Sequence, residues 1–568
     1  MNKFWQKSKA ILTKPQETIF SASLIIMLMI VASRVIGLVR LRVLAHFFVD
    51  SELALFFASF RLPDLVFEVL TLGALSSAFI PVFSARHKKD PDEAFDTASR
   101  ALNIGLLVFA VLAILFGLIA PHIYSVIAPG FDPDQTIQIA YLARVLFAAQ
   151  GFFVVSYAMT GVLESLKRFL IPALAPIFYN LGIILGTYLF VDQLGLLAPA
   201  LGVVIGAFCH FIIQLPFAYK LGFRFKLAIK PTADVKKIGR LATPRVIELL
   251  ILQLSKMAEL FLASLITLAS YTYYTFAYSA QALPVGLVGL SIAKAALPTL
   301  SAQSEDLKKF KQTLKTTIYQ VMFLIIPMAA FLIVLRVPII RLLFGTNIFD
   351  WEATIQTGFV LSAFAVGVPF QAASLLLTRS FYALHDTKTP VKVSLVATFI
   401  SIGMGFLLIM GLHVPTWGLA ASYAVGQIFQ ACVLYFLVSK KLNHGKFFSL
   451  LPVVKSLIAS AGSAFIMYYF LKFFDRSVWV KQISFVGSES IRTINFEAFV
   501  LDTRYTTNLI ILSGMTVLIG VAIYIALSLL MRSEELYAIL KVLRLRKIGS
   551  LSKEEESIVP TPSDTSQV

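Results

Sequence analysis

Arginine occurs twice in the first long apolar stretch of the sequence, at Arg34 and Arg40. Ionised side chains at membrane depth are costly, so each is a candidate for a functional role. If this stretch is a helix that ends near Arg40, then Arg34 lies about 9 Å inside that end. It cannot easily extend to the membrane surface, which favours a polar cavity over a structural ion pair. Arg40 is close enough to the interface to extend into water, and a role in the cavity is the alternative.

The second apolar stretch contains a proline flanked by charged residues. Arg61 and Asp64 lie on either side of Pro63, and Glu68 follows one turn later. Because proline lacks an N–H and its ring clashes with the preceding turn, we expect a break or kink here. Both an internal Arg–Glu pair and a contact between Arg61 and a ligand are compatible with this spacing.

A later apolar stretch, at residues 242–266, carries Gln253, Lys256 and Glu259. Lys256 and Glu259 are three residues apart, so on a helix they share one face and can pair. Their position near the middle of the stretch allows a buried structural pair, a gate, or a cation site at Glu259. His210, in the preceding stretch, is expected to be a hydrogen-bonded packing residue.

The sequence lacks several features on which other functions depend. It has no Walker A motif, no HExxH and no GxSxG, so neither ATP hydrolysis nor other enzymatic activity is expected. Its two cysteines, Cys209 and Cys432, both lie in apolar stretches and predict neither a disulfide framework nor a metal site. The formal net charge of +18 does not indicate nucleic-acid binding, because the basic residues occupy short segments between apolar stretches. No cofactor is expected.

Membrane-spanning helices must position these side chains. Hydrophobic residues make up 58% of the 568 residues and charged residues only 14%, below the quarter typical of soluble domains. The apolar stretches are about twenty residues long, enough to cross roughly 30 Å of hydrocarbon. We predict an all-α polytopic membrane protein with about fourteen transmembrane helices. They are expected at residues 20–40, 52–85, 100–122, 137–161, 170–191, 197–219, 242–266, 271–300, 315–335, 354–378, 389–411, 416–438, 450–473 and 507–531.

The distribution of Lys and Arg predicts the orientation. With the N-terminus inside and the helices alternating, most inside loops are rich in basic residues, whereas the outside loops at 192–196, 267–270 and 412–415 have none. This asymmetry follows the positive-inside rule and places both termini in the cytoplasm. The long outside loop at 474–506 is polar enough for a partner site; an ordered cap and disorder are the alternatives.

A weak internal repeat divides the chain. TGVLESLKRFLIP at 160–172 aligns with TRSFYALHDTKTP at 378–390, and AFIPVFSA at 78–85 aligns with AALPTLSA at nearly the same offset. Duplicated bundles with a site between the halves are a transporter architecture. We therefore expect two six-helix lobes followed by two further helices. The boundaries are an N-lobe at 1–235, a C-lobe at 236–445, the last two helices with the outside loop at 446–533, and a cytoplasmic tail at 534–568.

Six segments carry a resemblance to one family and together cover most of residues 20–440. ASRVIGLVR at 32–40 resembles the helix-1 signature of the MurJ/MviN family, and FRLPDLV at 60–66 with LGALSSAFIPVFS at 72–84 resembles its helix-2 signature. TPRVIELLILQ at 243–253 and ALPVGLVGLSIAKAALPTLS at 282–301 resemble helices 7 and 8. RSFYALHDTKTPVKVSL at 379–395 is similar to the loop between helices 10 and 11, and is the most specific match.

The resemblance implies a fold and a function. This family belongs to the multidrug/oligosaccharidyl-lipid/polysaccharide exporter superfamily, has fourteen helices in two lobes, and flips lipid II, the undecaprenyl-diphosphate-linked peptidoglycan precursor, across the bacterial cytoplasmic membrane. It implies a cationic cavity in which guanidinium groups bind the diphosphate. Arg34 and Arg40 match the two helix-1 arginines, Arg61 falls where members often have a basic residue, and Glu259 falls on the helix-7 acid position. From the lobe repeat and the arginines at membrane depth we also expect alternating access by rocking lobes, with the lipid tail along the last two helices.

The sequence departs from the family at several charged positions. Leu41 replaces Asp, Phe67 replaces Arg, Leu72 replaces an acid, and Ser279 stands at an Arg position. Another lipid-linked glycan is therefore an alternative substrate. A multidrug or cation antiporter of the same superfamily, a non-transporting scaffold for envelope assembly, and a membrane glycosyltransferase are rival functions.

The energy source and the partners are also expectations. Na⁺, H⁺ and the membrane potential are all open as driving forces. The expected partners are the lipid-linked glycan, membrane lipids and the cell-wall synthesis machinery, and the chain is expected to act as a monomer.

Overall fold

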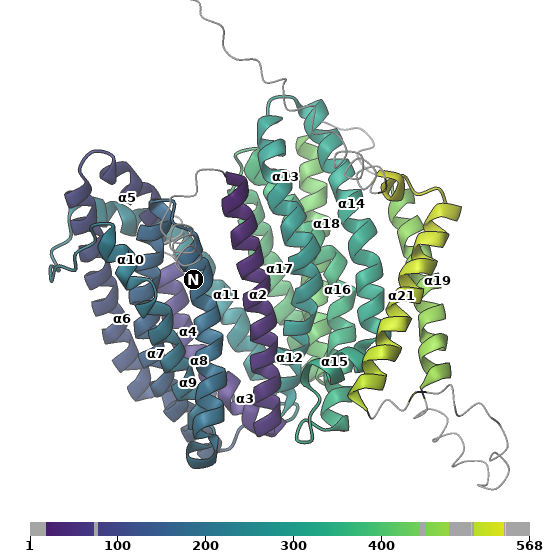
Figure 1. Ribbon diagram of the computed structural model, residues 1–568, viewed down its shortest axis with the longest axis horizontal. Coiled ribbons are helices and arrows are strands. Elements are labelled where there is room, and N and C mark those ends of the chain that lie inside the picture. Colours follow the sequence, from purple (N-terminus) through teal and green to yellow (C-terminus); the bar gives the residue numbers. More distant parts are fainter. Residues whose placement is uncertain are drawn as a thin grey trace, which may run out of the picture. The chain divides into compact units, whose positions relative to one another are not determined.

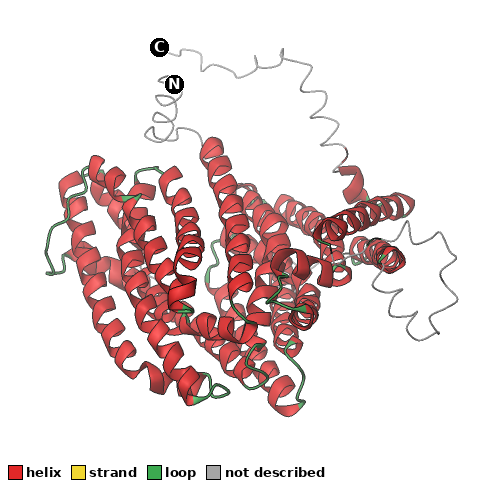
Figure 2. Ribbon diagram, turned by 60° about the horizontal axis from the view of Figure 1, so that its bottom comes forward, coloured by secondary structure: helices red, strands yellow, loops and turns green. Residues whose placement is uncertain are grey.

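The computed structural model describes residues 19–72, 78–442, 449–475, 501, 505–538 and 540. Within these ranges the chain is helical, and the one strand-like feature is an isolated bridge between Asp475 and Leu501 (Figure 2). The all-α fold class is confirmed. Most of the expected outside loop at 474–506 and of the expected tail at 534–568 lies outside the described residues.

Eleven helical segments among the described residues are long and apolar enough to cross a membrane. Each corresponds to an expected span. They are α6 (Pro91–Ile127), α7 (Pro133–Ser165), α8 (Leu170–Leu194), α9 (Leu197–Ile212) with α10 (Leu215–Lys220), α12 (Ser270–Pro284) with η3 (Val285–Leu290) and α13 (Ser291–Ala302), α14 (Leu307–Val334), α16 (Trp351–Ala383), α17 (Lys388–Phe406) with η4 (Leu407–Gly411), α18 (Trp417–Lys441), α19 (Leu451–Phe474) and α21 (Thr506–Leu530) (Figure 1).

The other three expected spans are helical as well. They correspond to α2 (Ile19–Phe47), to the broken segment of α3 (Asp50–Ser59), α4 (Arg61–Phe67), η1 (Glu68–Leu72) and α5 (Ile80–His87), and to α11 (Ala233–Ser264). A short helix, α15 (Arg336–Phe344), precedes α16. The polytopic architecture is therefore confirmed, while the exact number of fourteen spans stays a prediction.

The break expected at Pro63 is confirmed. α3 ends at Ser59, and α4 begins two residues later. Because proline has no N–H, Pro63 cannot donate to the carbonyl of Ser59, four residues earlier. That oxygen instead accepts a hydrogen bond of 2.9 Å from the hydroxyl of Tyr124 on α6. Tyr124 is completely buried, so the freed backbone group is satisfied inside the protein, as a membrane helix requires.

The first helix is longer than expected. α2 continues to Phe47, well beyond Arg40, because Leu41 and Leu44 are buried and the turns after Arg40 pack against the protein. Arg34 therefore lies about 20 Å from the C-terminal end of its helix at 1.5 Å per residue, instead of 9 Å. The charged residues at the end of the apolar run had suggested an earlier end.

Glycines allow α8 and α9 to pack at backbone distance. A Cβ atom added to Gly182 would lie 2.3 Å from the Cα of Gly206, and one added to Gly186 would lie 2.4 Å from the Cα of Gly202. Small residues four apart on facing membrane helices commonly permit such an approach. This helix pair contributes one wall of a cavity described below.

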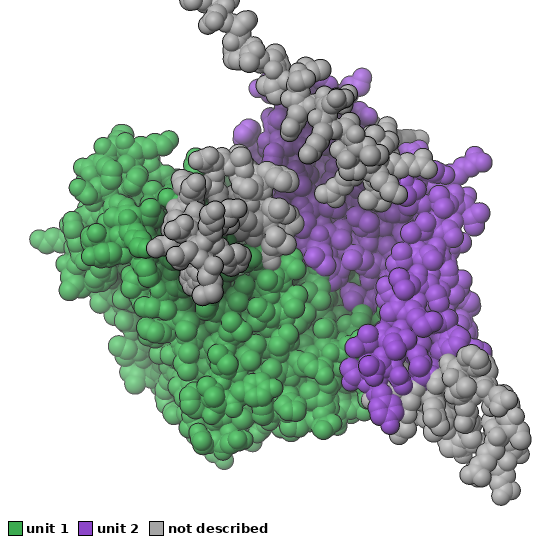
Figure 3. All heavy atoms as spheres, in the orientation of Figure 1, with its two compact units in different colours: residues 1–283, 335–370, 386–434 green, residues 284–334, 371–385, 435–568 purple. Residues whose placement is uncertain are grey.

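The chain separates into two compact units (Figure 3). Unit 1 comprises residues 1–283, 335–370 and 386–434, and unit 2 comprises residues 284–334, 371–385 and 435–568. These units do not follow the boundaries at 235 and 445, and the division into lobes stays a prediction. In unit 2, α14, α19 and α21 meet at Phe323, Ala459 and Tyr524, and the Tyr524 hydroxyl donates to the carbonyl of Phe323 at 2.7 Å.

Candidate binding cavities

A cavity of about 400 Å³ within unit 1, here named the charged cavity, brings together four ionisable side chains. It is bordered by α4, η1, α11, α12, α17 and α18. Its charged lining residues are Arg61, Glu68, Lys256 and Glu259. Hydroxyl and amide groups line much of the rest, from Tyr271, Tyr274, Tyr278, Ser394, Thr398, Tyr423, Gln427 and Gln430.

Glu68 is the centre of a polar cluster in this cavity. The Nζ of Lys256 lies 2.9 Å and 3.1 Å from the two carboxylate oxygens, and the amide of Gln253 donates to one of them at 2.5 Å. Pairing with Glu259 was one alternative for Lys256, but its ion pair forms with Glu68 on another helix. Among the ion pairs of the described residues none joins Arg61 to Glu68, and contact with a ligand stays the other alternative for Arg61.

Glu259 and Arg61 occupy the same cavity with fewer partners. The hydroxyls of Ser255 and Tyr274 donate to the Glu259 carboxylate, the former at 3.5 Å. The guanidinium of Arg61 lies over the ring of Tyr271, 5.5 Å from its centroid. Its Nε is buried and has no hydrogen-bond partner among the described residues.

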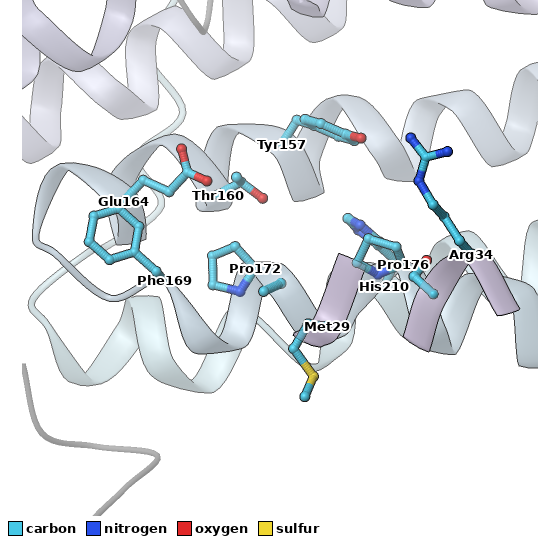
Figure 4. A pocket seen from close by; sticks show the side chains of 11 residues that line it. Met29, Arg34, Tyr157, Thr160, Glu164, Phe169, Pro172, Pro176 and His210 are labelled. Atoms are coloured by element: carbon cyan, nitrogen blue, oxygen red, sulfur yellow. The ribbon is translucent and has the colours of Figure 1, made fainter. Parts of the chain in front are cut away.

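Arg34 lies in a different cavity, here named the α2 cavity, of about 400 Å³ in unit 1. Figure 4 shows Arg34 near one end, Glu164 near the other, and Tyr157 between them. The Nη1 of Arg34 donates to the carbonyl of Ala282 on α12 at 3.2 Å. The lining residues come from α2, α7, α8, α9 and the α7–α8 connection: Met29, Ser33, Arg34, Tyr157, Thr160, Glu164, Phe169, Pro172, Ala173, Pro176 and His210.

His210, at the edge of the α2 cavity, is a hydrogen-bonded packing residue, as expected. The hydroxyl of Ser156 lies 2.6 Å from its Nδ1, and the amide of Gln214 donates to that hydroxyl at 2.8 Å. The imidazole stacks on Tyr157, with 5.7 Å between ring centroids. Thr160 donates to the side chain of Gln214, which extends this polar chain along α7.

Arg40 belongs to neither set of lining residues. Its guanidinium lies over the ring of Tyr179 on α8, 5.9 Å from the centroid, and its buried Nε has no described partner. The three arginines expected to bind substrate thus occupy three places: Arg61 in the charged cavity, Arg34 in the α2 cavity, and Arg40 on the α2–α8 contact.

The tyrosines of α12 are the main feature that sequence reasoning missed. Tyr271, Tyr274 and Tyr278 line the charged cavity, and Tyr278 is in edge contact with Tyr423 of α18. Their spacing of three and four residues places them on one face of a helix, and this signal could have found them.

Two positions at which the sequence departs from the family pattern are packed in the interior. Leu41 is buried, and Phe67 packs against Phe153 and Tyr157. Ser279, by contrast, lines the charged cavity and donates to the carbonyl of Thr275. A hydroxyl therefore stands there in place of a guanidinium.

The fold and the cavities define a class of protein: a polytopic helical membrane protein with the fold of known transporters. A solved structure described as lipid II flippase MurJ in an inward closed conformation matches with a TM-score of 0.73 and 24% identity, over 90% of this chain and 99% of that chain. An inward-facing multidrug resistance MATE family transporter of the MOP superfamily matches with a TM-score of 0.61 and 14% identity, over 72% of this chain and 94% of that chain.

The sequence comparison identifies the family. The family model "Lipid II flippase MurJ" matches residues 43–488, and the chain belongs to this family. The "probable lipid II flippase MurJ" of Bdellovibrio bacteriovorus is 29% identical over 450 residues, which cover 76% of this chain and 84% of that protein. The protein of the same name from Rickettsia prowazekii is 24% identical over 491 residues, which cover 84% of this chain and 95% of that protein.

Proposed function

We propose that this chain is a flippase that carries lipid II across the bacterial cytoplasmic membrane. Membership of the lipid II flippase family, whose model matches residues 43–488, is the observation that carries this proposal. The charged cavity adds a physical argument. A cavity lined by a guanidinium group and a wall of hydroxyl and amide groups suits a head group that joins phosphates to sugars.

We assign Arg61, Arg34 and Arg40 to the substrate path. Arg61 lines the charged cavity, and arginine can bind the phosphate oxygens of a diphosphate through two parallel hydrogen bonds. Arg34 and Arg40 would act at successive positions along α2. No covalent chemistry is part of this role.

We assign Lys256, Gln253 and Glu68 to a gate. Glu68 belongs to the expected N-lobe, whereas Lys256 and Gln253 belong to the expected C-lobe, and their contact joins η1 to α11. Rocking of the lobes in alternating access would break and remake this contact. Glu259, which faces the same cavity, is the candidate site for a coupling ion, and Na⁺, H⁺ and the membrane potential remain the alternatives.

A flippase for another lipid-linked glycan is the second candidate. It is favoured by Phe67 and Ser279, where the family usually carries arginine: one side chain packs in the core and the other offers only a hydroxyl. Fewer cationic donors in the cavity would suit a head group that is recognised more through its sugars.

Complementation of a bacterium depleted of its own MurJ, scored by lipid II translocation, tests the proposal. Rescue with translocation is the expected result. Arg34→Ala should abolish rescue while the protein remains in the membrane, and Arg34→Lys should restore part of it. A correctly folded chain that translocates no lipid II, but does translocate another polyprenyl-diphosphate glycan, would favour the second candidate.

We also propose the setting in which the chain works. Its termini would lie in the cytoplasm, it would act as a monomer, and it would supply substrate to the cell-wall synthesis machinery. Cysteines introduced at Lys89 and Asp192 test the orientation. A membrane-impermeant thiol reagent should label only position 192 from the outside, and labelling of position 89 would reverse the topology.

A further inference from the structure

We propose that the segment at residues 224–230, between α10 and α11, is a membrane anchor, here named the interfacial loop. It would insert Phe225, Leu227 and Ile229 at the bilayer interface and bind anionic phospholipid head groups through Lys226 and Lys230. This surface lies outside both cavities, and its role does not depend on the transported substrate.

The interfacial loop is held against α6 through its backbone. The Ser99 hydroxyl donates to the carbonyl of Arg224 at 2.9 Å, and the Asn103 amide donates to the carbonyls of Lys226 and Ala228 at 2.7 Å and 3.1 Å. Arg100 donates to the carbonyl of Lys230 at 3.1 Å. Alternate carbonyls of the loop accept these hydrogen bonds, as in an extended backbone, in which side chains two residues apart lie on the same side.

This arrangement leaves the apolar side chains outside and the polar backbone satisfied. Phe225 is 55% exposed, Leu227 is 89% exposed, and Ile229 is 58% exposed. Four carbonyls of the loop already have donors on α6, which removes much of the cost of leaving water. Exposed apolar side chains on such a backbone are suited to the boundary between head groups and acyl chains.

The position of the loop on α6 matches that boundary. Asn103, which donates to the loop on both sides of Leu227, is one turn before Leu107, at about 1.5 Å of rise per residue. Leu107 and Val111 are 49% and 57% exposed, and they begin the apolar face that α6 presents along its length. The loop therefore lies at the end of an exposed apolar surface of α6.

The charges of the loop fit an anionic lipid. Lys226 and Lys230 are exposed, and their side chains have no partners among the described residues. Arg224 is occupied, because it stacks on Tyr219 and donates to that residue's carbonyl. The sequence has no acidic residue from 219 to 233, so the loop is purely cationic. Basic side chains beside apolar ones are attracted to anionic head groups and held by acyl chains.

The test places a polarity-sensitive fluorophore on the loop of the full chain. Leu227→Cys, in a chain with Cys209→Ala and Cys432→Ser, is labelled in nanodiscs of phosphatidylcholine with or without phosphatidylglycerol. The matched control is Lys89→Cys, an exposed position on the turn before α6. Lipids spin-labelled near the head group should quench the label at position 227 and not the label at position 89.

Charge variants test the head-group contact. Each lysine near an anionic surface changes binding roughly fivefold, so Lys226→Gln with Lys230→Gln should weaken the phosphatidylglycerol-dependent binding of the loop, read from the quenching, by about 25-fold. Lys88→Gln with Lys89→Gln should leave it unchanged. If iodide in water quenches the label at position 227 as fully as that at position 89 in both kinds of nanodisc, the anchor is refuted, and the loop becomes a surface for a protein partner. Insertion that ignores phosphatidylglycerol would refute the head-group contact.

Discussion

Replacing Gly186 by alanine should force α8 and α9 apart. The added Cβ would lie 2.4 Å from the Cα of Gly202 and 2.9 Å from its backbone nitrogen, whereas ordinary contact begins at 3.4 Å. Both neighbours are backbone atoms, so no side chain can rotate away. The helices must separate locally by about 1 Å, and the facing surfaces lose their closest contacts.

The magnitude is the difference between two opposing effects. Overpacking a close contact costs roughly 1–3 kcal/mol. Replacing glycine by alanine within a helix stabilises the helix by up to about 1 kcal/mol. We therefore expect a net loss of about 1–2 kcal/mol for Gly186→Ala. At Gly403 on α17 an added Cβ meets no atom within 4 Å, so Gly403→Ala should stabilise the protein.

The assay is thermal unfolding in detergent, followed by gel filtration of the heated sample. The Gly186 variant should leave the monodisperse peak a few degrees below the parent, and the Gly403 variant at or above it. Translocation should fall in the Gly186 variant, because α8 and α9 wall the α2 cavity. If both variants shift the melting temperature equally, the close approach of these helices does not limit stability, and the reasoning is wrong.

Three further predictions concern charged groups. Lys256→Met and Glu68→Gln, combined in a double-mutant cycle, should give a coupling energy of about 1–2 kcal/mol in unfolding. This is less than a fully buried ion pair would give, because the two side chains are 35% and 25% exposed. A coupling energy near zero would mean that the contact does not contribute to stability. Arg61→Ala should lower the translocation rate at least about tenfold with no change in melting temperature. A loss of this size is expected when a charge-assisted contact to phosphate is removed. Unchanged translocation would remove Arg61 from the substrate path. Hydrogen bonding by the backbone N–H of Lys309 lowers the pKa of Asp306 in the folded protein. The ionised carboxylate therefore stabilises the fold fully above the pKa that Asp306 has in the unfolded chain. This stabilisation is lost as the pH falls through its pKa in the folded protein. Asp306→Asn should therefore melt below the parent at neutral pH, and the gap should shrink below about pH 4; a gap that persists in acid would argue for another cause.

Local features of the sequence predicted the helices well. Runs of about twenty apolar residues have few uses other than crossing a membrane, and each expected span is helical where the chain is described. The break at Pro63 also followed from local chemistry, since a missing N–H acts within one turn. The end of α2 did not follow, because burial of Leu41 and Leu44 depends on neighbours that are remote in the sequence.

The partners of the charged residues were beyond local reasoning for a similar reason. Spacing on one helix suggested that Lys256 pairs with Glu259, but the carboxylate it contacts is 188 residues away. Charge and depth identified candidates without saying which share a cavity. Arg34 and Arg61 looked alike in the sequence, and only the tertiary packing, with α2 against α8, places them in different cavities.

The glycine contact between α8 and α9 has a consequence for how the protein is made. The two helices are consecutive and are joined by a short turn at Gly195, whose positive φ of 52° suits glycine. Membrane helices insert first and associate afterwards, and contacts between neighbours in sequence form early. This hairpin needs nothing from α11 or any later helix, so it can assemble while the ribosome is still making the second half of the chain. A bulky residue at the α8–α9 interface would then first impair biogenesis, because the incompletely assembled nascent chain is exposed to membrane proteases. An effect on the transport rate of the finished protein would come only after that.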